Sequence, residues 1–300
     1  MAWFFYSILA RLFWSVAGVS EKYLIEKKFK SPIVYLVIGF FAGLTSMIII
    51  PFVGFKLPPI NLLLLNSLAA FCFFIATYFY VKVVQLEEIS RINLWWNITP
   101  IFTFLIAWLA IGERLSSTQL LAFALLVSGA VVTSLHAIGK KIVVSHALYL
   151  MLICCFFYAC HDVIVRYISS YIPFSTIYII NTILFCVFSL FFFLSRQFRN
   201  QFKQQHVSVG YPISLIAIII IVALLSRAGI VANLKAISLG PVALVGATEG
   251  FQSLFVFIIA VLLTLFFPKI IKEEIDKKNV LLKIGALILM VFGVVVLSFS

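Results

Sequence analysis

Charged residues are scarce in this 300-residue sequence: Asp, Glu, Lys and Arg make up 11% of it, and hydrophobic residues make up 64%. Soluble domains carry about 25% charged residues. A soluble core could not bury this much apolar surface, so we expect lipid to be the solvent for much of the chain. The composition therefore excludes an ordinary water-soluble protein.

Several chemical signatures are also missing. The five cysteines form no Cys-x-x-Cys pair, and no second His or Cys stands at ligand spacing from His161, so we expect neither a metal site nor a redox motif. No P-loop or other nucleotide motif is present, so the sequence does not support ATP-driven chemistry, and we expect no cofactor. The net charge of +12 comes mostly from Lys and Arg beside the apolar runs, where they meet lipid headgroups, so we do not expect nucleic-acid binding.

Long continuous apolar runs are abundant. A helix needs roughly 20 apolar residues to cross the hydrocarbon, and the runs lack the alternating pattern of a membrane barrel. The sequence therefore predicts an all-α polytopic membrane protein with ten transmembrane helices. The predicted spans are 3–20, 32–53, 61–81, 89–111, 117–136, 146–165, 173–195, 211–234, 241–267 and 281–299.

The chain also resembles itself. Three segments of the first half match segments of the second half in the same order, which predicts two repeats, 1–136 and 146–300. Because each half has five spans, the second would enter the membrane in the opposite sense, giving the inverted repeat that many transporters have. The matched segments are Lys82–Leu109 with Lys235–Leu262, Lys22-Tyr23 with Arg166-Tyr167, and Gly129-Ala130-Val131-Val132 with Gly293-Val294-Val295-Val296.

The fourth and fifth predicted spans carry a motif set, and the first span adds two residues to it. The set comprises Trp95-Trp96-Asn97-Ile98-Thr99-Pro100-Ile101-Phe102, Gly112-Glu113, Gln119, Gly129, Trp14 and Lys22. With these residues the sequence resembles the EamA family of the drug/metabolite transporter superfamily, which implies ten helices in two inverted halves, a central cavity and alternating access. The second half departs from the family pattern, because Ser253 stands at the expected Pro position and the Gly-Glu exit is missing.

Glu249 is the most informative charged residue, because it lies well inside the ninth predicted span. Charges at such depth are costly and usually face a cavity or a partner. One interpretation is a carboxylate that couples transport to protons or binds a cation. The other is a structural ion pair with Arg227 or Arg91.

Further charged residues are candidates for substrate contact, each with a structural alternative. Arg227 lies inside the eighth span, where we favour a cavity position, and for Arg11 in the first span we favour snorkelling to the interface. Asp162 and Arg166 have the spacing of a salt bridge within one helix, and Glu113 is expected to order a turn. The same spacing relates Arg91 to Glu87 near the fourth span, as a substrate contact or an interfacial ion cluster. Glu21 and Lys22 form a lateral gate or an interfacial pair.

Trp95, Trp96 and Asn97 come one turn before Pro100. Proline removes a helix hydrogen bond and can leave a kink with a free carbonyl, and broken helices line binding sites in transporters. We therefore expect an aromatic wall for an amphipathic or aromatic substrate. The structural alternative is a tryptophan pair that packs between helices.

The predicted function is a secondary transporter, an exporter or exchanger, of a small metabolite or amphipathic organic solute. We expect it to work in the cytoplasmic membrane by alternating access, with proton coupling, as a monomer or homodimer whose partners are its small-molecule substrate and membrane lipids. A flippase for lipid-linked substrates is the main alternative. A non-transporting scaffold and a membrane-embedded lipid enzyme are less favoured, and we expect no catalytic activity.

The orientation can be read from the basic residues, which concentrate on the cytoplasmic side of membrane proteins. Most of the 22 Lys and Arg residues follow odd-numbered spans, which predicts both termini outside. The resemblance to the family implies the reverse, with both termini inside.

Overall fold

The computed structural model describes residues 2–29, 31–49, 55–87, 92, 95–134, 146–209, 212–266 and 277–298. All regular structure within these residues is helical, which confirms the predicted all-α class. The elements, in chain order, are α1 (Ala2–Lys27), α2 (Pro32–Ala42), η1 (Gly43–Ile49), α4 (Ile60–Leu86), α6 (Thr99–Ile111), α7 (Ser117–Ser134), α8 (His146–Ile168), α9 (Phe174–Leu190), η3 (Phe191–Leu194), α10 (Arg196–Val209), α11 (Ile213–Leu239), α12 (Val242–Ala247), α13 (Glu249–Phe266) and α14 (Lys277–Ser298).

Helix length and composition confirm a multi-pass membrane protein. Among the described residues, six stretches are long and apolar enough to cross a bilayer: Ala2–Ile25, Ile60–Leu86, His146–Ile168, Phe174–Leu194, Ile213–Leu239 and Val242–Ile259. Each falls on a predicted span. Shorter apolar helices lie on the other four predicted spans, at Pro32–Ile48, Thr99–Ile111, Ser117–Val132 and Ile284–Leu297.

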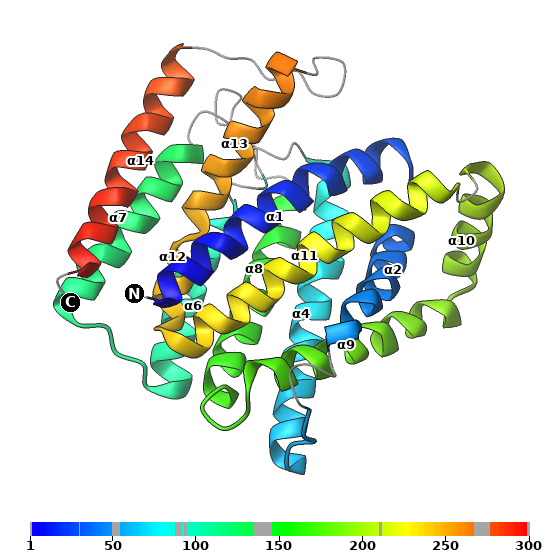
Figure 1. The fold of residues 1–300 in the computed structure, drawn as a ribbon, viewed down its shortest axis with the longest axis horizontal. Coiled ribbons are helices and arrows are strands. Elements are labelled where there is room, and N and C mark those ends of the chain that lie inside the picture. The colour runs from blue at the N-terminus through cyan, green and yellow to red at the C-terminus, as the bar shows by residue number, and fades with distance from the viewer. Residues whose placement is uncertain are drawn as a thin grey trace.

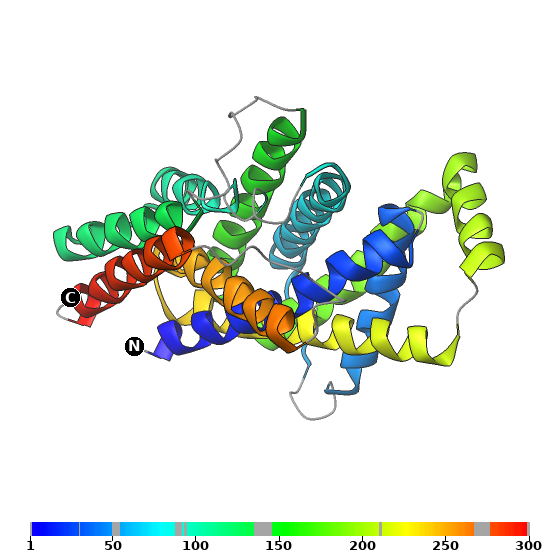
Figure 2. The same ribbon diagram turned by 90° about the horizontal axis from the view of Figure 1, so that it is seen from above.

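Helices far apart in the sequence pack side by side. Helix α1 lies along α11 and helix α4 lies along α8, so each half of the chain supplies one helix to both pairs. Helix α6 also packs on α8, and α13 packs on α1. Figures 1 and 2 show α7 and α14 together at one end of the molecule and α10 at the other.

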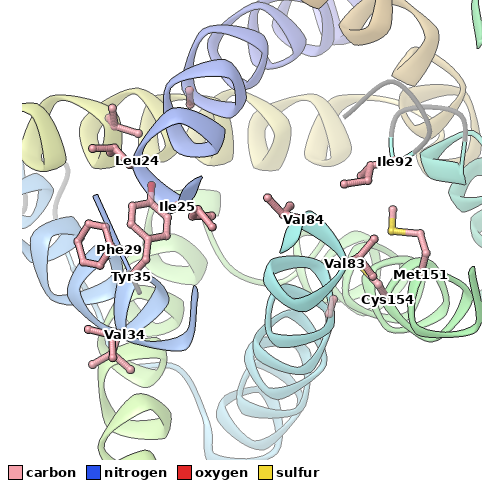
Figure 3. Close-up of a cluster of buried hydrophobic side chains, with 14 of the residues drawn as sticks. Leu24, Ile25, Phe29, Val34, Tyr35, Val83, Val84, Ile92, Met151 and Cys154 are labelled. Atoms are coloured by element: carbon pink, nitrogen blue, oxygen red, sulfur yellow. The ribbon is translucent and has the colours of Figure 1, made fainter. Parts of the chain in front are cut away.

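The largest buried apolar cluster lies where α1, α2, α4 and α8 meet. Figure 3 shows Leu24 and Ile25 of α1, Tyr35 of α2, Val83 of α4 and Met151 of α8, all within this cluster. Their burial fixes the ends of these helices against one another. Apolar packing thus joins the first half of the chain to the helix that begins the second half.

Helices α7 and α14 approach closely because glycines lie between them. A Cβ at Gly129 would come within 2.6 Å of Met290 Cγ and 3.0 Å of the Ala286 carbonyl oxygen. On the other helix, a Cβ at Gly293 would meet Leu125 Cβ at 3.2 Å. Small residues that let two backbones approach are typical of helix packing in membranes.

The polar stretch between the seventh and eighth predicted spans forms helix α10. Its apolar residues Phe198 and Phe202 pack against Phe193 of η3, while its Lys and Arg residues are exposed. Gln205 donates a hydrogen bond of 2.8 Å to the Lys28 carbonyl just beyond α1. The segments that follow the first and seventh predicted spans therefore lie together.

Two predicted spans contain interruptions. Helix α6 begins only at Thr99, after a turn at Asn97 and Ile98, and Pro100 occupies its first turn, where the missing N–H costs nothing. Pro100 therefore lies at the start of α6, next to the interruption, and not at a kink within a continuous helix. The ninth predicted span is divided at Thr248 into α12 and α13.

Candidate functional site

The break at Thr248 is held by side chains of α1. Thr248 Oγ1 bonds back to the Val245 carbonyl at 2.7 Å and lies 2.5 Å from Ser7 Oγ. Arg11 donates to Thr248 Oγ1 at 3.2 Å and to the Val245 carbonyl at 3.1 Å. Arg11 therefore adds a side-chain donor to the Val245 carbonyl, which also accepts the backbone N–H of Thr248 at 3.2 Å where α12 ends.

Arg11 also forms an ion pair with Glu249, the first residue of α13. Arg11 Nη1 lies 2.5 Å from Glu249 Oε1, and both side chains are buried, with 1% and 6% exposure. The expectation that Arg11 snorkels to the interface is wrong, because helix α13 covers it. The described ion-pair partner of Glu249 is Arg11 and not Arg227, and Arg91, the other partner considered, lies outside the described residues.

A cavity of about 190 Å³ opens beside this ion pair. It lies between the two halves of the chain, with walls from α1, α2, α4, α8, α11 and α13. This volume far exceeds what one water molecule needs. The residues that line it include Trp14, Glu21, Tyr35, Phe40, Phe73, Thr77, Tyr80, Trp96, Tyr158, Ser226, Arg227, Glu249 and Gln252.

Glu21 lies in the cavity wall near the end of α1. Its Oε1 accepts a hydrogen bond of 2.9 Å from Ser226 of α11, and the Tyr35 hydroxyl lies within hydrogen-bonding reach of the carboxylate. Its sequence neighbour Lys22 turns elsewhere and donates to the Glu87 carbonyl at 3.5 Å. Glu21 thus links α1 to α11 across the cavity.

Arg227 reaches the cavity from the middle of α11, where the sequence predicted it. The residue is 5% exposed, and its Nη1 has no hydrogen-bond partner among the described residues. Its guanidinium carbon lies 5.5 Å from the ring centre of Phe185 and 5.9 Å from that of Phe40. A buried cation with an unused donor is costly in an apolar interior, so the site is suited to an anion.

The residues before Pro100 divide between the two expected roles. Trp96 lines the cavity, with its ring centre 5.3 Å from that of Tyr158. Trp95 packs against the buried cluster of α1, α2, α4 and α8 and is not among the cavity residues. Asn97 is buried and donates a hydrogen bond of 3.0 Å to the Ala130 carbonyl of α7. Of this tryptophan pair, Trp96 therefore contributes to the aromatic wall of the cavity and Trp95 does not.

The expected salt bridge between Asp162 and Arg166 does not form. Asp162 lies 2.9 Å from the Nδ1 atom of His161, while Arg166 pairs with Glu113 at 3.3 Å and donates to the Ile237 carbonyl at 3.0 Å. Arg166 points toward the connection after α6 and the end of α11, where Glu113 and the Ile237 carbonyl are its partners. Glu113 thereby joins α8 and the start of α12 to its own turn, since it also accepts a hydrogen bond from the Ala243 amide.

One prediction concerns residues that the structure does not describe. Arg91 and Glu88 lie outside the described residues, so the ion cluster predicted there stays a prediction. Within the described part of the chain, no group of three His, Cys, Asp or Glu side chains is placed to hold a metal ion.

Sequence reasoning missed several residues of the cavity. Tyr35, Tyr80 and Tyr158 line it, and Ser226 fixes one of its carboxylates. A polar hydroxyl on an otherwise apolar helix was the available signal, but it does not identify the face on which the cavity lies. The role of Arg11 was missed because an arginine within an apolar run is compatible both with snorkelling to the interface and with a buried ion pair.

Comparison with known proteins gives a family match for the first part of the chain and a fold for nearly all of it. A family model described as "EamA-like transporter family" matches residues 1–135. A solved structure described as "Crystal structure of protein" has a TM-score of 0.64 at 14% sequence identity, with 98% of this chain and 96% of that chain covered. At this identity the likeness concerns the fold alone. No curated protein matches the sequence.

Proposed function

Because residues 1–135 belong to the EamA-like transporter family of the drug/metabolite transporter superfamily, we propose that this membrane protein is a secondary transporter of a small metabolite or amphipathic organic solute. The observation that carries the proposal is the cavity between the halves, lined by Glu249, Arg227 and an aromatic wall. Substrate sites of secondary transporters lie at such repeat interfaces, beside interrupted helices.

The proposal includes two repeats, 1–136 and 146–300. Helices α4 and α11 support it, because both have 27 residues and both follow a proline. The shift in residue number that relates Lys82 to Lys235 also relates Pro59 to Pro212, and it carries both ends of α4 onto the ends of α11. Helices related by duplication are expected to share both their length and this spacing.

Similar hydrogen bonds near the helix ends also support the repeat. Near the end of α1, Lys22 donates to the Glu87 carbonyl just beyond α4. Near the end of α8, Arg166 donates to the Ile237 carbonyl in the last turn of α11. A basic residue thus satisfies the C-terminal carbonyls of the third span in each half, as helix ends favour.

The contacts between connecting segments favour ten crossings with the halves inverted. Gln205 bonds to Lys28, which joins segments after the seventh and first spans. Glu113, after the fourth span, contacts Arg166 at the end of the sixth and the Ala243 amide at the start of the ninth, at 3.5 Å. If all ten helices crossed the membrane, the connections after odd-numbered spans would lie together on one side and those after even-numbered spans on the other. The contacts above follow this grouping.

Alternating access would then open the cavity to each side in turn. The pair of Arg11 and Glu249 spans α1 and α13, and the bond from Ser226 to Glu21 spans α1 and α11, so both tie one half to the other. Such contacts would break or shift when the halves rock. We propose that Glu249 couples this movement to protons and that the protein works in the cytoplasmic membrane.

Counterflow in proteoliposomes tests the proposal. We expect vesicles that contain the protein, loaded with one unlabelled metabolite at a time, to accumulate the labelled form of at least one. Trp96→Ala should reduce that accumulation several-fold, because Trp96 lines the cavity. Trp108→Ala is the matched control, since Trp108 is 51% exposed on the outside of α6. Absence of counterflow across a broad metabolite panel would overturn the proposal.

A further inference from the structure

The charges that line the cavity are unequally partnered. The carboxylate of Glu249 is neutralised by Arg11, and that of Glu21 accepts a hydrogen bond from Ser226. Arg227 forms no ion pair with any described carboxylate. The cavity therefore presents one cation, Arg227, that forms no ion pair with the described residues around it.

The described residues around Arg227 hold its guanidinium in place without accepting hydrogen bonds from it. The rings of Phe40 and Phe185 make cation–π contacts with the guanidinium, and these contacts supply no ordinary hydrogen-bond acceptor. Gly43, at the start of η1, packs directly on the guanidinium, and a Cβ there would lie 2.7 Å from Arg227 Cζ and closer still to Nε and Nη2. The missing side chain of Gly43 leaves the space that the guanidinium occupies.

We propose that Arg227 is the residue that binds the acidic group of an organic monocarboxylate, whose apolar or aromatic body lies against the aromatic wall of the cavity. A guanidinium presents two parallel N–H donors that match a carboxylate. Arg227 is the one cationic side chain among the described residues that line the cavity, which suits a single negative charge better than a diphosphate. This inference rests on the proposed transport function and adds its substrate class.

The aromatic wall gives the body of the ligand its place. Tyr158 lies at the centre, with ring centroid distances of 5.3 Å to Trp96, 5.8 Å to Phe73 and 6.5 Å to Trp14. These residues come from α1, α4, α8 and the segment just before α6, and thus from both halves. A cavity of about 190 Å³ fits a body of one ring or a short chain better than a large polycyclic compound.

Equilibrium binding to the full chain in phosphatidylcholine nanodiscs tests the inference without requiring transport. The probes are phenylacetate, phenylacetamide and phenethylammonium, which share one aromatic body and differ in charge. Calorimetry and the fluorescence of the cavity tryptophans are the readouts. We expect phenylacetate to bind at least about tenfold more tightly than the neutral and cationic probes, because only a carboxylate pairs with the guanidinium.

Variants separate a binding role of Arg227 from a structural one. Arg227→Gln should abolish the preference for phenylacetate, and Arg227→Lys should retain part of it. Gly43→Ala keeps the charge but displaces the guanidinium, so it should weaken phenylacetate binding while phenylacetamide binding stays unchanged. Arg114→Gln, which removes an exposed charge outside the cavity, should change neither.

The outcomes distinguish this inference from the proposed function. Equal binding of the three probes, or a preference that survives Arg227→Gln, would overturn the assignment of the anion site. Loss of phenylacetate binding in nanodiscs of phosphatidylglycerol would instead identify the occupant as an anionic lipid, which also overturns it. Counterflow of a neutral or cationic solute would then still support transport, whereas failure of all counterflow would reject the transporter itself.

Discussion

Arg11 Nη1 and Glu249 Oε1 lie 2.5 Å apart, although the two residues belong to the first and ninth predicted spans. The same arginine donates to Thr248 and to the Val245 carbonyl, so it holds both sides of the break between α12 and α13. One buried cation thereby stabilises a carboxylate and an interrupted helix. The cavity lies directly beside this contact, since Glu249 forms part of its wall.

Replacing Glu249 by Gln tests proton coupling. The amide can still accept a hydrogen bond from Arg11, but it cannot exchange a proton in the pH range of transport. We expect Glu249→Gln to remove the pH dependence of counterflow in proteoliposomes while the protein stays folded. Glu113→Gln is the control, because Glu113 lies outside the cavity. A pH profile identical to that of the unmodified protein would defeat the coupling role.

Removing Arg11 alone should destabilise the fold. Arg11→Met leaves the Glu249 carboxylate buried without its cation, and breaking a buried pair in this way costs about 3–5 kcal/mol. We expect a lower melting temperature in detergent for Arg11→Met and partial recovery when Glu249→Gln is added. Additive losses from the two changes would show that the ion pair contributes no coupling energy.

The close packing of α7 and α14 predicts opposite effects for two glycine substitutions. Gly129→Ala brings a methyl group against Met290 and the Ala286 carbonyl, and such overpacking costs about 1–3 kcal/mol. At Gly285 nothing lies within 4 Å, so Gly285→Ala should stabilise the helix by up to about 1 kcal/mol. Thermal unfolding of the two variants, measured side by side, checks the sign of each effect.

The distribution of basic residues predicts the orientation. We expect Ser300→Cys to react with an impermeant thiol reagent in intact cells, because the charge bias places both termini outside. Lys203→Cys on α10, which follows the seventh span, should be protected until the cells are opened. The reverse pattern would place the termini inside, in agreement with the expectation from the family.

Much of the helical plan follows from local sequence. Apolar runs such as 61–81 and 211–234 became helices, because an uninterrupted apolar run in lipid must satisfy its backbone internally. The family resemblance is confirmed over residues 1–135, since it rests on short motifs that are readable without a structure. Helix ends were less accurate: α6 begins at Thr99, and α12 ends at Ala247 because tertiary contacts stabilise the break after it.

The choice of partners was decided only in three dimensions. The sequence determined that Arg11, Arg227 and Glu249 lie within apolar spans, and the high cost of charge there marked them as significant. It could not determine which of the two arginines meets Glu249, because that depends on how α1, α11 and α13 cross and rotate. The tertiary structure pairs Arg11 with Glu249 and leaves Arg227 facing the cavity, since α13 packs on α1.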